Sequence, residues 1–219
     1  GALRAHPSTA RRTLEGIAPG LHAHPVRHRG NATWSPEEAA VVAGIVTDLI
    51  GRSWQPVRTD ASGRSVSEPA RPLSAADVIV VTPYNAQQVA VEEALEAAGH
   101  GDVRVGTVDR FQGQEAAVAI VSLAASAGRD APRGLEFLLL RNRLNVAVSR
   151  AMHAAFVVYS PGLLDDLPRT PEGVARLSAF ARLVGADPDA SFGAGPGGDA
   201  QIGSAVGDVN PVQVASARS

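Results

Sequence analysis

Four consecutive β-branched residues, Val78-Ile79-Val80-Val81, constrain the fold more than any other part of the chain. A strand with one exposed face alternates apolar and polar residues, whereas a strand covered on both faces is apolar throughout. Thr82 and Pro83 end the run, because proline cannot donate a hydrogen bond inside a sheet. Residues 78–81 are therefore predicted to form an interior strand of a parallel sheet with helices on both faces.

Strands and helices alternate along the rest of the chain, which predicts an α/β fold with a doubly wound parallel sheet. Other short apolar runs predict strands over residues 21–26, 103–108, 118–122 and 154–159. Helical patterns predict helices over residues 36–50, 85–98, 143–151 and 171–184. Residues 135–140 are apolar and fit either a strand or a helical turn.

The predicted helices begin at recognisable capping residues. Ser35 is a typical N-cap, and Pro36 fits the first helical position, where its missing N–H costs nothing. Glu38 stands three residues after Ser35, so we expect it to close a capping box. Asn85 is the expected cap of the second helix.

Residues 52–74 are rich in Ser, Pro, Arg and Asp and are longer than most connections. We expect a surface excursion or a mobile insert there, in which Trp54 packs onto the domain rather than stacking on a base. Residues 124–133 are expected to form a loop.

The chain contains no lysine, because all 20 residues counted as Lys or Arg are arginines. The phosphate-binding loop G-x-x-x-x-G-K-[ST] needs its lysine to reach the β- and γ-phosphates of a nucleotide. That loop is absent from these residues. We therefore expect the chain by itself to have no ATPase activity.

Composition sets further limits on function. A net charge of −2 and a pI near 6.3 exclude a uniformly basic surface and leave only a local basic groove possible. The chain has no cysteine, which fits a cytoplasmic setting, and no apolar run near the roughly 20 residues that span a bilayer. His22, His24 and His28 lack partners at metal-ligand spacing, so we interpret them as polar loop residues. The chain begins at Gly1, and we expect it to start within a longer protein.

Two polar segments look suited to phosphate binding. Residues 105–115 (VGTVDRFQGQE) follow an apolar run and contain a glycine among polar groups. Residues 143–151 (RLNVAVSRA) fit a short helix, in which Arg143 and Arg150 are seven positions apart and share a face. Two guanidinium groups presented together suit bidentate recognition of phosphate or carboxylate.

These segments resemble the motifs of a known family. Residues 78–87 (VIVVTPYNAQ), 105–115 and 143–151 look like motifs IV, V and VI of superfamily 1 helicases of the nonsense-mediated-decay and Okazaki-fragment-processing type. The motifs occur in the family's order, and the resemblance covers about residues 21–159. The nearest resemblance is to bacterial proteins that fuse a RecB-like nuclease to such a helicase.

The resemblance implies a P-loop-NTPase-type architecture and a motor function. Family members move along single-stranded nucleic acid and carry two RecA-like domains with ATP and Mg²⁺ between them. This chain looks like the second domain, over residues 21–184, without a P-loop of its own. Residues 1–20 are expected to be a linker or the end of a preceding segment, and residues 185–219 a flexible tail. The expected partners are the N-terminal RecA-like domain, which holds most of the metal's ligands, and single-stranded DNA or RNA.

The resemblance also implies roles for residues at the nucleotide. Arg150 would be the arginine finger, and Arg143 would brace motif V or couple ATP to the strand. The N–H of Gly113 would approach the γ-phosphate, while Glu115 would accept hydrogen bonds from the ribose. Gln112 would link the nucleotide and strand sites. The ordinary alternatives are a surface ion pair for Arg150, a tight turn at Gly113 and a helix-start carboxylate for Glu115.

A second set of residues is assigned to the strand. The hydroxyls of Thr82 and Thr107 would contact backbone phosphates, and Asp109 belongs to the same side. Tyr84 would either stack on a base or pack in the core. Ligands of parallel sheets gather at the carboxyl ends of strands, so we expect one site along one sheet edge.

Two other functions fit parts of the sequence. The absence of lysine is compatible with a non-catalytic module that binds nucleic acid or protein. A metabolic nucleotide-binding enzyme is disfavoured, because no G-x-G-x-x-G follows a predicted strand. The nuclease of the resembling fusions uses a catalytic lysine, so that activity is not encoded in these residues.

Overall fold

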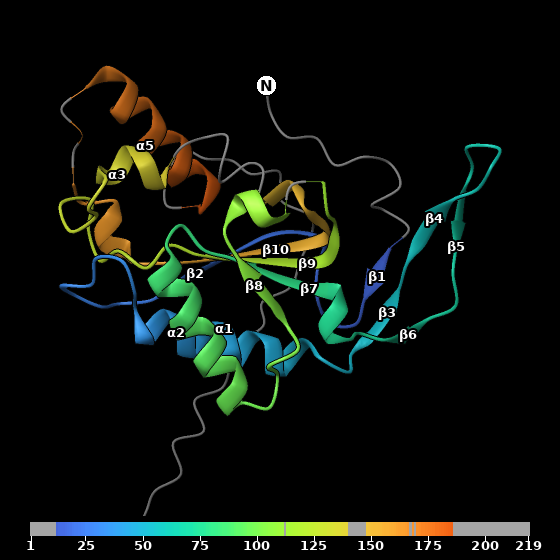
Figure 1. The fold of residues 1–219 in the computed structure, drawn as a ribbon. Coiled ribbons are helices and arrows are strands. Elements are labelled where there is room, and N and C mark those ends of the chain that lie inside the picture. Colours follow the sequence, from blue (N-terminus) through green and yellow to red (C-terminus); the bar gives the residue numbers. More distant parts are fainter. Residues whose placement is uncertain (1–11, 112, 140–147, 167, 169, 186–219) are drawn as a thin grey trace, which may run out of the picture.

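The computed structural model describes residues 12–111, 113–139, 148–166, 168 and 170–185. Its centre is a five-stranded sheet with the order β2-β10-β9-β7-β8, in which every neighbouring pair is parallel. Figure 1 shows the sheet crossing the middle of the molecule. The strands are β2 (Gly20–Pro25), β7 (Val78–Val81), β8 (Arg104–Gly106), β9 (Ala116–Ser122) and β10 (Ala151–Tyr159). The predicted α/β fold with a parallel sheet is confirmed.

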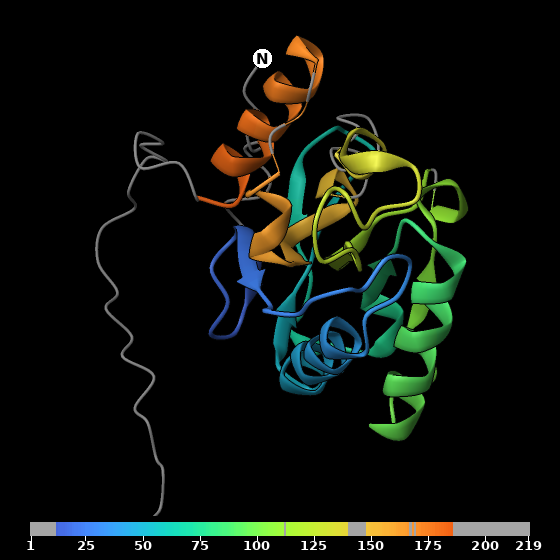
Figure 2. The same ribbon diagram turned by 90° about the vertical axis from the view of Figure 1, so that its left-hand side faces the viewer.

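Helices cover both faces of the sheet, as Figures 1 and 2 show. One face packs against α1 (Pro36–Leu49) and α2 (Asn85–Ala97). The other packs against α3 (Gly134–Leu138) and α5 (Pro171–Leu183). The apolar segment near residue 135 is therefore helical. Among the described residues, no helix is both long and apolar enough to cross a membrane.

The strand β7 explains why the sheet has a core on each side. All four of its side chains are buried. Val78 and Val80 belong to the core beneath α1 and α2, whereas Ile79 and Val81 belong to the core beneath α3 and α5. Successive side chains of a strand point to opposite faces, so a continuous apolar run supplies both cores at once.

The start of α1 differs from the expected capping box in one respect. The Ser35 hydroxyl accepts a hydrogen bond from the Glu38 N–H at 3.1 Å, and Pro36 occupies the first helical turn, as predicted. The Glu38 side chain does not return to the Ser35 backbone. Instead, the Ser35 N–H donates to Gln87 Oε1 at 2.6 Å, which leaves the Glu38 carboxylate free to enter the interior.

The N-cap of α2 lies one residue earlier than the sequence pattern predicts. Tyr84, not Asn85, is the N-cap residue, and its side chain makes no capping hydrogen bond. The Tyr84 carbonyl already accepts a hydrogen bond from the Gln88 N–H at 3.1 Å. Asn85 is therefore the first residue inside the helix.

Residues 52–74 contain small sheets that the sequence pattern did not predict. Strands β3 (Ser53–Gln55) and β6 (Arg71–Pro72) join β1 (Thr13–Leu14) in one sheet, and β4 (Val57–Thr59) pairs with β5 (Ser65–Ser67) in a hairpin. The hairpin projects from the body of the molecule, as expected of a surface excursion (Figure 1). Trp54 is fully buried in an edge contact with His153, so its predicted packing role is confirmed.

An ion pair between Arg71 and Asp77 lies at the end of this segment, just before β7. The Asp77 carboxylate accepts two hydrogen bonds from Arg71, both at 2.6 Å, and two from Ser74, at 2.9 Å from its N–H and 2.6 Å from its hydroxyl. Burial alone would raise the pKa of Asp77. The hydrogen bonds outweigh burial and lower its pKa to about 2.

Replacing Asp77 by Asn should remove stability that depends on pH. The pKa of Asp77 is lower in the folded state than its unfolded value of 3.8, so the ionised carboxylate stabilises the fold above pH 3.8. This stabilisation is lost as the pH falls through about 2. The Asp77→Asn variant should be less stable by roughly 2 kcal/mol at pH 5, and the difference should shrink towards pH 2. Denaturant unfolding between pH 5 and pH 2 measures it, with the exposed Asp102→Asn variant as control. A difference that stays constant across this range would contradict the linkage.

Candidate functional site

Motifs V and VI meet at the amino ends of two adjacent strands. Glu115 immediately precedes β9, and Arg150 immediately precedes β10. The Ala116 N–H donates to the Arg150 carbonyl at 3.0 Å, and Ala116 pairs with Ala151 in the parallel register. Gly113 lies two residues before Glu115. Three of the five residues assigned to the nucleotide are thus brought to one place on the sheet edge.

Each of these three residues is accessible. Gly113 has a φ of +78° and no atom within 4 Å of where a Cβ would stand, so its backbone conformation favours glycine. Glu115 is exposed, and Arg150 is half-buried. The Arg150 guanidinium donates a long hydrogen bond, 3.5 Å, to the Ser149 hydroxyl. The amino edge therefore carries a cation, a carboxylate and a glycine just before the starts of two adjacent strands.

The remaining two assigned residues, Arg143 and Gln112, lie outside the described residues. The predicted helix over residues 143–151 is described only at its end. Val148 and Ser149 are helical, Arg150 forms a turn, and Ala151 already belongs to β10. The expected end of this helix is therefore too late.

The expectation of one site along one edge is wrong. Thr82 and Tyr84 follow β7, and Thr107 follows β8, so these three lie at the carboxyl edge of the sheet. Residues 107–115 then carry the chain back to the amino edge with no helix longer than the 3-10 turn Val108–Phe111. Motif V therefore begins at one edge of the sheet and ends at the other.

The strand-assigned side chains at the carboxyl edge differ in accessibility. Thr82 is buried, and its hydroxyl donates to the Tyr84 carbonyl at 3.2 Å. Tyr84 is half-buried with its ring 5.8 Å from that of Phe137, and burial raises the pKa of its hydroxyl. Thr107 is half-buried, and Asp109 is exposed on the 3-10 turn. Thr107 and Asp109 are thus the more accessible of the four.

A buried carboxylate stands behind the carboxyl edge, and sequence reasoning missed it. Glu38 is fully buried; its Oε2 accepts from the Ser122 hydroxyl at 2.7 Å and the Ala124 N–H at 2.9 Å. Its Oε1 lies 3.0 Å from His28 Nε2. The available signal was spacing: Glu38 stands four residues before Val42 on the apolar stripe of α1, so it faces inward.

The hydrogen bonds of Glu38 continue into a network. His28 Nδ1 lies 2.7 Å from the Ser126 hydroxyl and 3.2 Å from the side-chain amide nitrogen of Asn31. The backbone N–H of Asn31 donates to the Ser126 hydroxyl at 2.9 Å. Gln87 donates to the Ser122 hydroxyl at 2.8 Å. His28 was interpreted as a polar loop residue, but its side chain is fully buried. The network joins the β2–α1 connection, α1, α2 and the end of β9.

The described residues contain no cluster of three or more His, Asp or Glu side chains able to hold a metal ion.

The parallel sheet, the two motif-bearing edges and the sequence comparison together define the class of this chain. Residues 20–161 match a family model described as an AAA domain, so the chain belongs to that family. The domain is the C-terminal part of superfamily 1 helicases.

Several curated helicases are similar to this chain. It is 32% identical over 140 residues to an uncharacterized ATP-dependent helicase of Caenorhabditis elegans, covering 64% of the chain and 7% of the relative. It is 42% identical over 78 residues to the DNA polymerase alpha-associated DNA helicase A of Schizosaccharomyces pombe, covering 36% and 11%. It is 36% identical over 95 residues to the human RNA helicase Mov10l1, covering 42% and 8%. The chain thus spans only a small part of each relative.

Replacing Glu38 by Ala should destabilise the domain strongly. The change leaves the Ser122 hydroxyl, the Ala124 N–H and the His28 ring without their acceptor in the interior. Breaking a buried ionic or hydrogen-bonded pair costs about 3–5 kcal/mol. Urea unfolding of Glu38→Ala should show this loss, whereas the exposed Glu93→Ala change on α2 should stay within about 0.5 kcal/mol of wild type. Equal stability of the two variants would refute a supporting role for Glu38.

Proposed function

We propose that this chain is the second motor domain of an ATP-dependent helicase or translocase that acts on single-stranded DNA or RNA. The observation that carries the proposal is the adjacency of Arg150 and Glu115 at the amino ends of β10 and β9. An arginine from motif VI and a carboxylate from motif V thus stand immediately before two neighbouring parallel strands.

The proposal requires a partner domain. The chain has no lysine, so the loop that cradles the phosphates of ATP and most ligands of its Mg²⁺ must come from an N-terminal RecA-like domain. The amino edge of this chain suits the opposite side of the nucleotide. A carboxylate such as Glu115 fits a ribose diol and repels phosphate, while the Arg150 guanidinium and the Gly113 N–H would fit the phosphate end. Arg143 and Gln112 are further candidates by resemblance.

In this arrangement the chain's residues stabilise charge and couple it to movement. Arg150 would neutralise the negative charge that spreads over the oxygens of the transferred phosphoryl group. Contacts from Arg150 and Gly113 would form as the two domains close and break as they open. Thr107, Asp109 and Tyr84 would contact the strand at the opposite edge, so that domain closure changes these contacts. Thr82 is buried and would support this edge without touching the strand.

Three narrower assignments belong to the same proposal. The relatives named above include one DNA helicase and one RNA helicase, which supports a nucleic-acid ligand without choosing the sugar. The resemblance to bacterial RecB-like nuclease–helicase fusions supports a nuclease elsewhere in the native protein. A cytoplasmic location is compatible with the absence of cysteine.

The Arg150→Ala variant should abolish strand-stimulated ATP hydrolysis. Arginine fingers contribute about 10³–10⁵ in rate, so the kcat of the longest native protein that contains this chain should fall by at least about 10³-fold. Strand binding without nucleotide should change little, because Arg150 lies at the other edge. The control is Arg64→Ala in the β4–β5 hairpin, which removes the same charge away from both edges. Hydrolysis by Arg150→Ala within a few-fold of wild type would sink the assignment.

The Glu115→Ala variant should lose discrimination between sugars. Hydrogen bonds to a charged group contribute about 1.5–3 kcal/mol, so the wild type should favour ATP over 2′,3′-dideoxy-ATP by about 10- to 100-fold in kcat/KM. Without the carboxylate, this ratio should approach one through loss of activity on ATP. Glu93→Ala is the matched control. An unchanged ratio in Glu115→Ala would show that Glu115 does not contact the ribose.

A further inference from the structure

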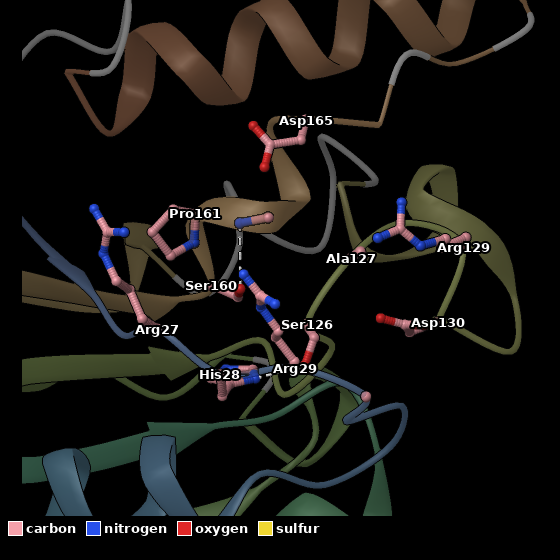
Figure 3. Close-up of a pocket in the computed structure, with 12 residues that line it drawn as sticks. Arg27, His28, Arg29, Ser126, Ala127, Arg129, Asp130, Ser160, Pro161 and Asp165 are labelled. Atoms are coloured by element: carbon pink, nitrogen blue, oxygen red, sulfur yellow. Dashed lines mark hydrogen bonds between the residues drawn. The ribbon is translucent and has the colours of Figure 1, made fainter.

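A pocket of about 850 Å³ opens at the carboxyl ends of β2, β10 and β9. Its walls are the segments that follow these three strands, over residues 27–30, 126–130 and 160–165. Figure 3 shows side chains from all three segments around it. Gly162 makes the close approach of two walls possible, because a Cβ there would stand 2.5 Å from the Ser126 carbonyl oxygen. None of the residues assigned above to nucleotide or strand lines this pocket.

Two arginines that line the pocket have no ion-pair partner among the described residues. Arg27 and Arg29 are both exposed, and within the described part of the chain neither makes a hydrogen bond or an ion pair. Arg129, by contrast, is paired with Asp166 at 2.8 Å. Figure 3 shows the Arg27 side chain beside Pro161 and the Arg29 side chain directed towards Ser160. Two guanidinium groups of this kind suit the oxygens of a phosphate.

The segment that carries the arginines is held in place from below. The His28 side chain, between the two arginines, points inward and is hydrogen-bonded to Glu38 and Ser126. Arg27 and Arg29 project outward and are exposed. An anchored backbone reduces the ordering that binding would otherwise require. The buried network therefore presents this pair of arginines to the pocket.

We propose that this pocket binds backbone phosphates of the single strand through Arg27 and Arg29. The inference rests on the proposed function, because it extends the strand track from the ends of β7 and β8 across the same carboxyl edge. Strands lie about 4.8 Å apart, so four spacings from β8 to β2 span roughly 19 Å. The β2–α1 connection also carries Trp34, which is 53% exposed, and aromatic side chains with arginines suit single strands.

Acidic groups limit what the pocket can hold. Asp130 and Asp165 also line it, so a densely charged ligand would meet repulsion away from the arginines. A flexible single strand can place one or two phosphates on Arg27 and Arg29 and leave its sugars near the carboxylates. An acidic protein segment is the competing ligand, and the experiment separates the two.

The test is the double variant Arg27→Ala/Arg29→Ala in the longest native protein that contains this chain. Binding of fluorescein-labelled oligo-dT and oligo-U is measured without nucleotide over a series of salt concentrations. Each phosphate contact to a single strand contributes about 0.7 to the slope of log affinity against log salt. The variant should lose about 1.4 of that slope and about tenfold in affinity at moderate salt for both oligonucleotides.

Two control variants show whether the location of the arginines or only their positive charge matters for strand binding. Arg58→Ala/Arg64→Ala in the β4–β5 hairpin removes the same charge and should leave affinity and slope unchanged. Arg27→Lys/Arg29→Lys should keep most of the slope, because the positive charges remain. Equal loss in the hairpin control would overturn a localised site, as would wild-type affinity and slope in Arg27→Ala/Arg29→Ala.

The outcome can also be told apart from failure of the proposed function. A strand-binding defect in Arg27→Ala/Arg29→Ala supports the pocket even if Arg150→Ala hydrolyses ATP normally. Normal strand binding by the double variant, beside a hydrolysis defect in Arg150→Ala, overturns the pocket and leaves the motor intact. Absence of strand binding by wild type, or displacement of the oligonucleotide by lower concentrations of poly-glutamate than of unlabelled oligo-dT, overturns the pocket assignment.

Discussion

The carboxylate of Glu38 is the constraint on which the arrangement of the carboxyl edge depends. A buried charge without partners is strongly unfavourable, so the surrounding chain must bring donors to it. Ser122 and the Ala124 N–H come from the end of β9, and His28 comes from the connection after β2. The hydrogen bonds to Glu38 fix the directions in which the connections after β2 and β9 leave the sheet. The apolar cores on the two faces of the sheet could not fix these directions, because apolar contacts are non-directional.

The parallel sheet places the two polar edges at opposite ends of the same strands. β9 has seven residues and β10 has nine, so the edges are roughly 20–30 Å apart at about 3.3 Å per residue. Seven of the nine β10 residues and all of β9 are buried, and both strands have neighbours on either side. Two such strands form a stiff connection. The proposed coupling between the nucleotide and strand sites would therefore require movement of the domain as a rigid body.

The sequence predicted those parts of the fold in which a local pattern has one physical interpretation. The run at β7 and the Ser35-Pro36 start of α1 are of this kind, and both are confirmed. The small sheets around Trp54 were missed because strands of two or three residues are too short to show a period. The division of the site between two edges was missed because residues 107–115 cross the sheet without a regular helix. The inward turn of Glu38 depends on donors 84 and 86 positions away, which no local pattern contains.

The basic residues of this chain have one further consequence for both edges. All of them are arginines, and a guanidinium group stays charged at any physiological pH. Arg150, Arg27 and Arg29 therefore attract phosphate through guanidinium groups and not through ammonium groups. Binding of phosphate at either edge should consequently weaken as the salt concentration rises, because salt screens these charges.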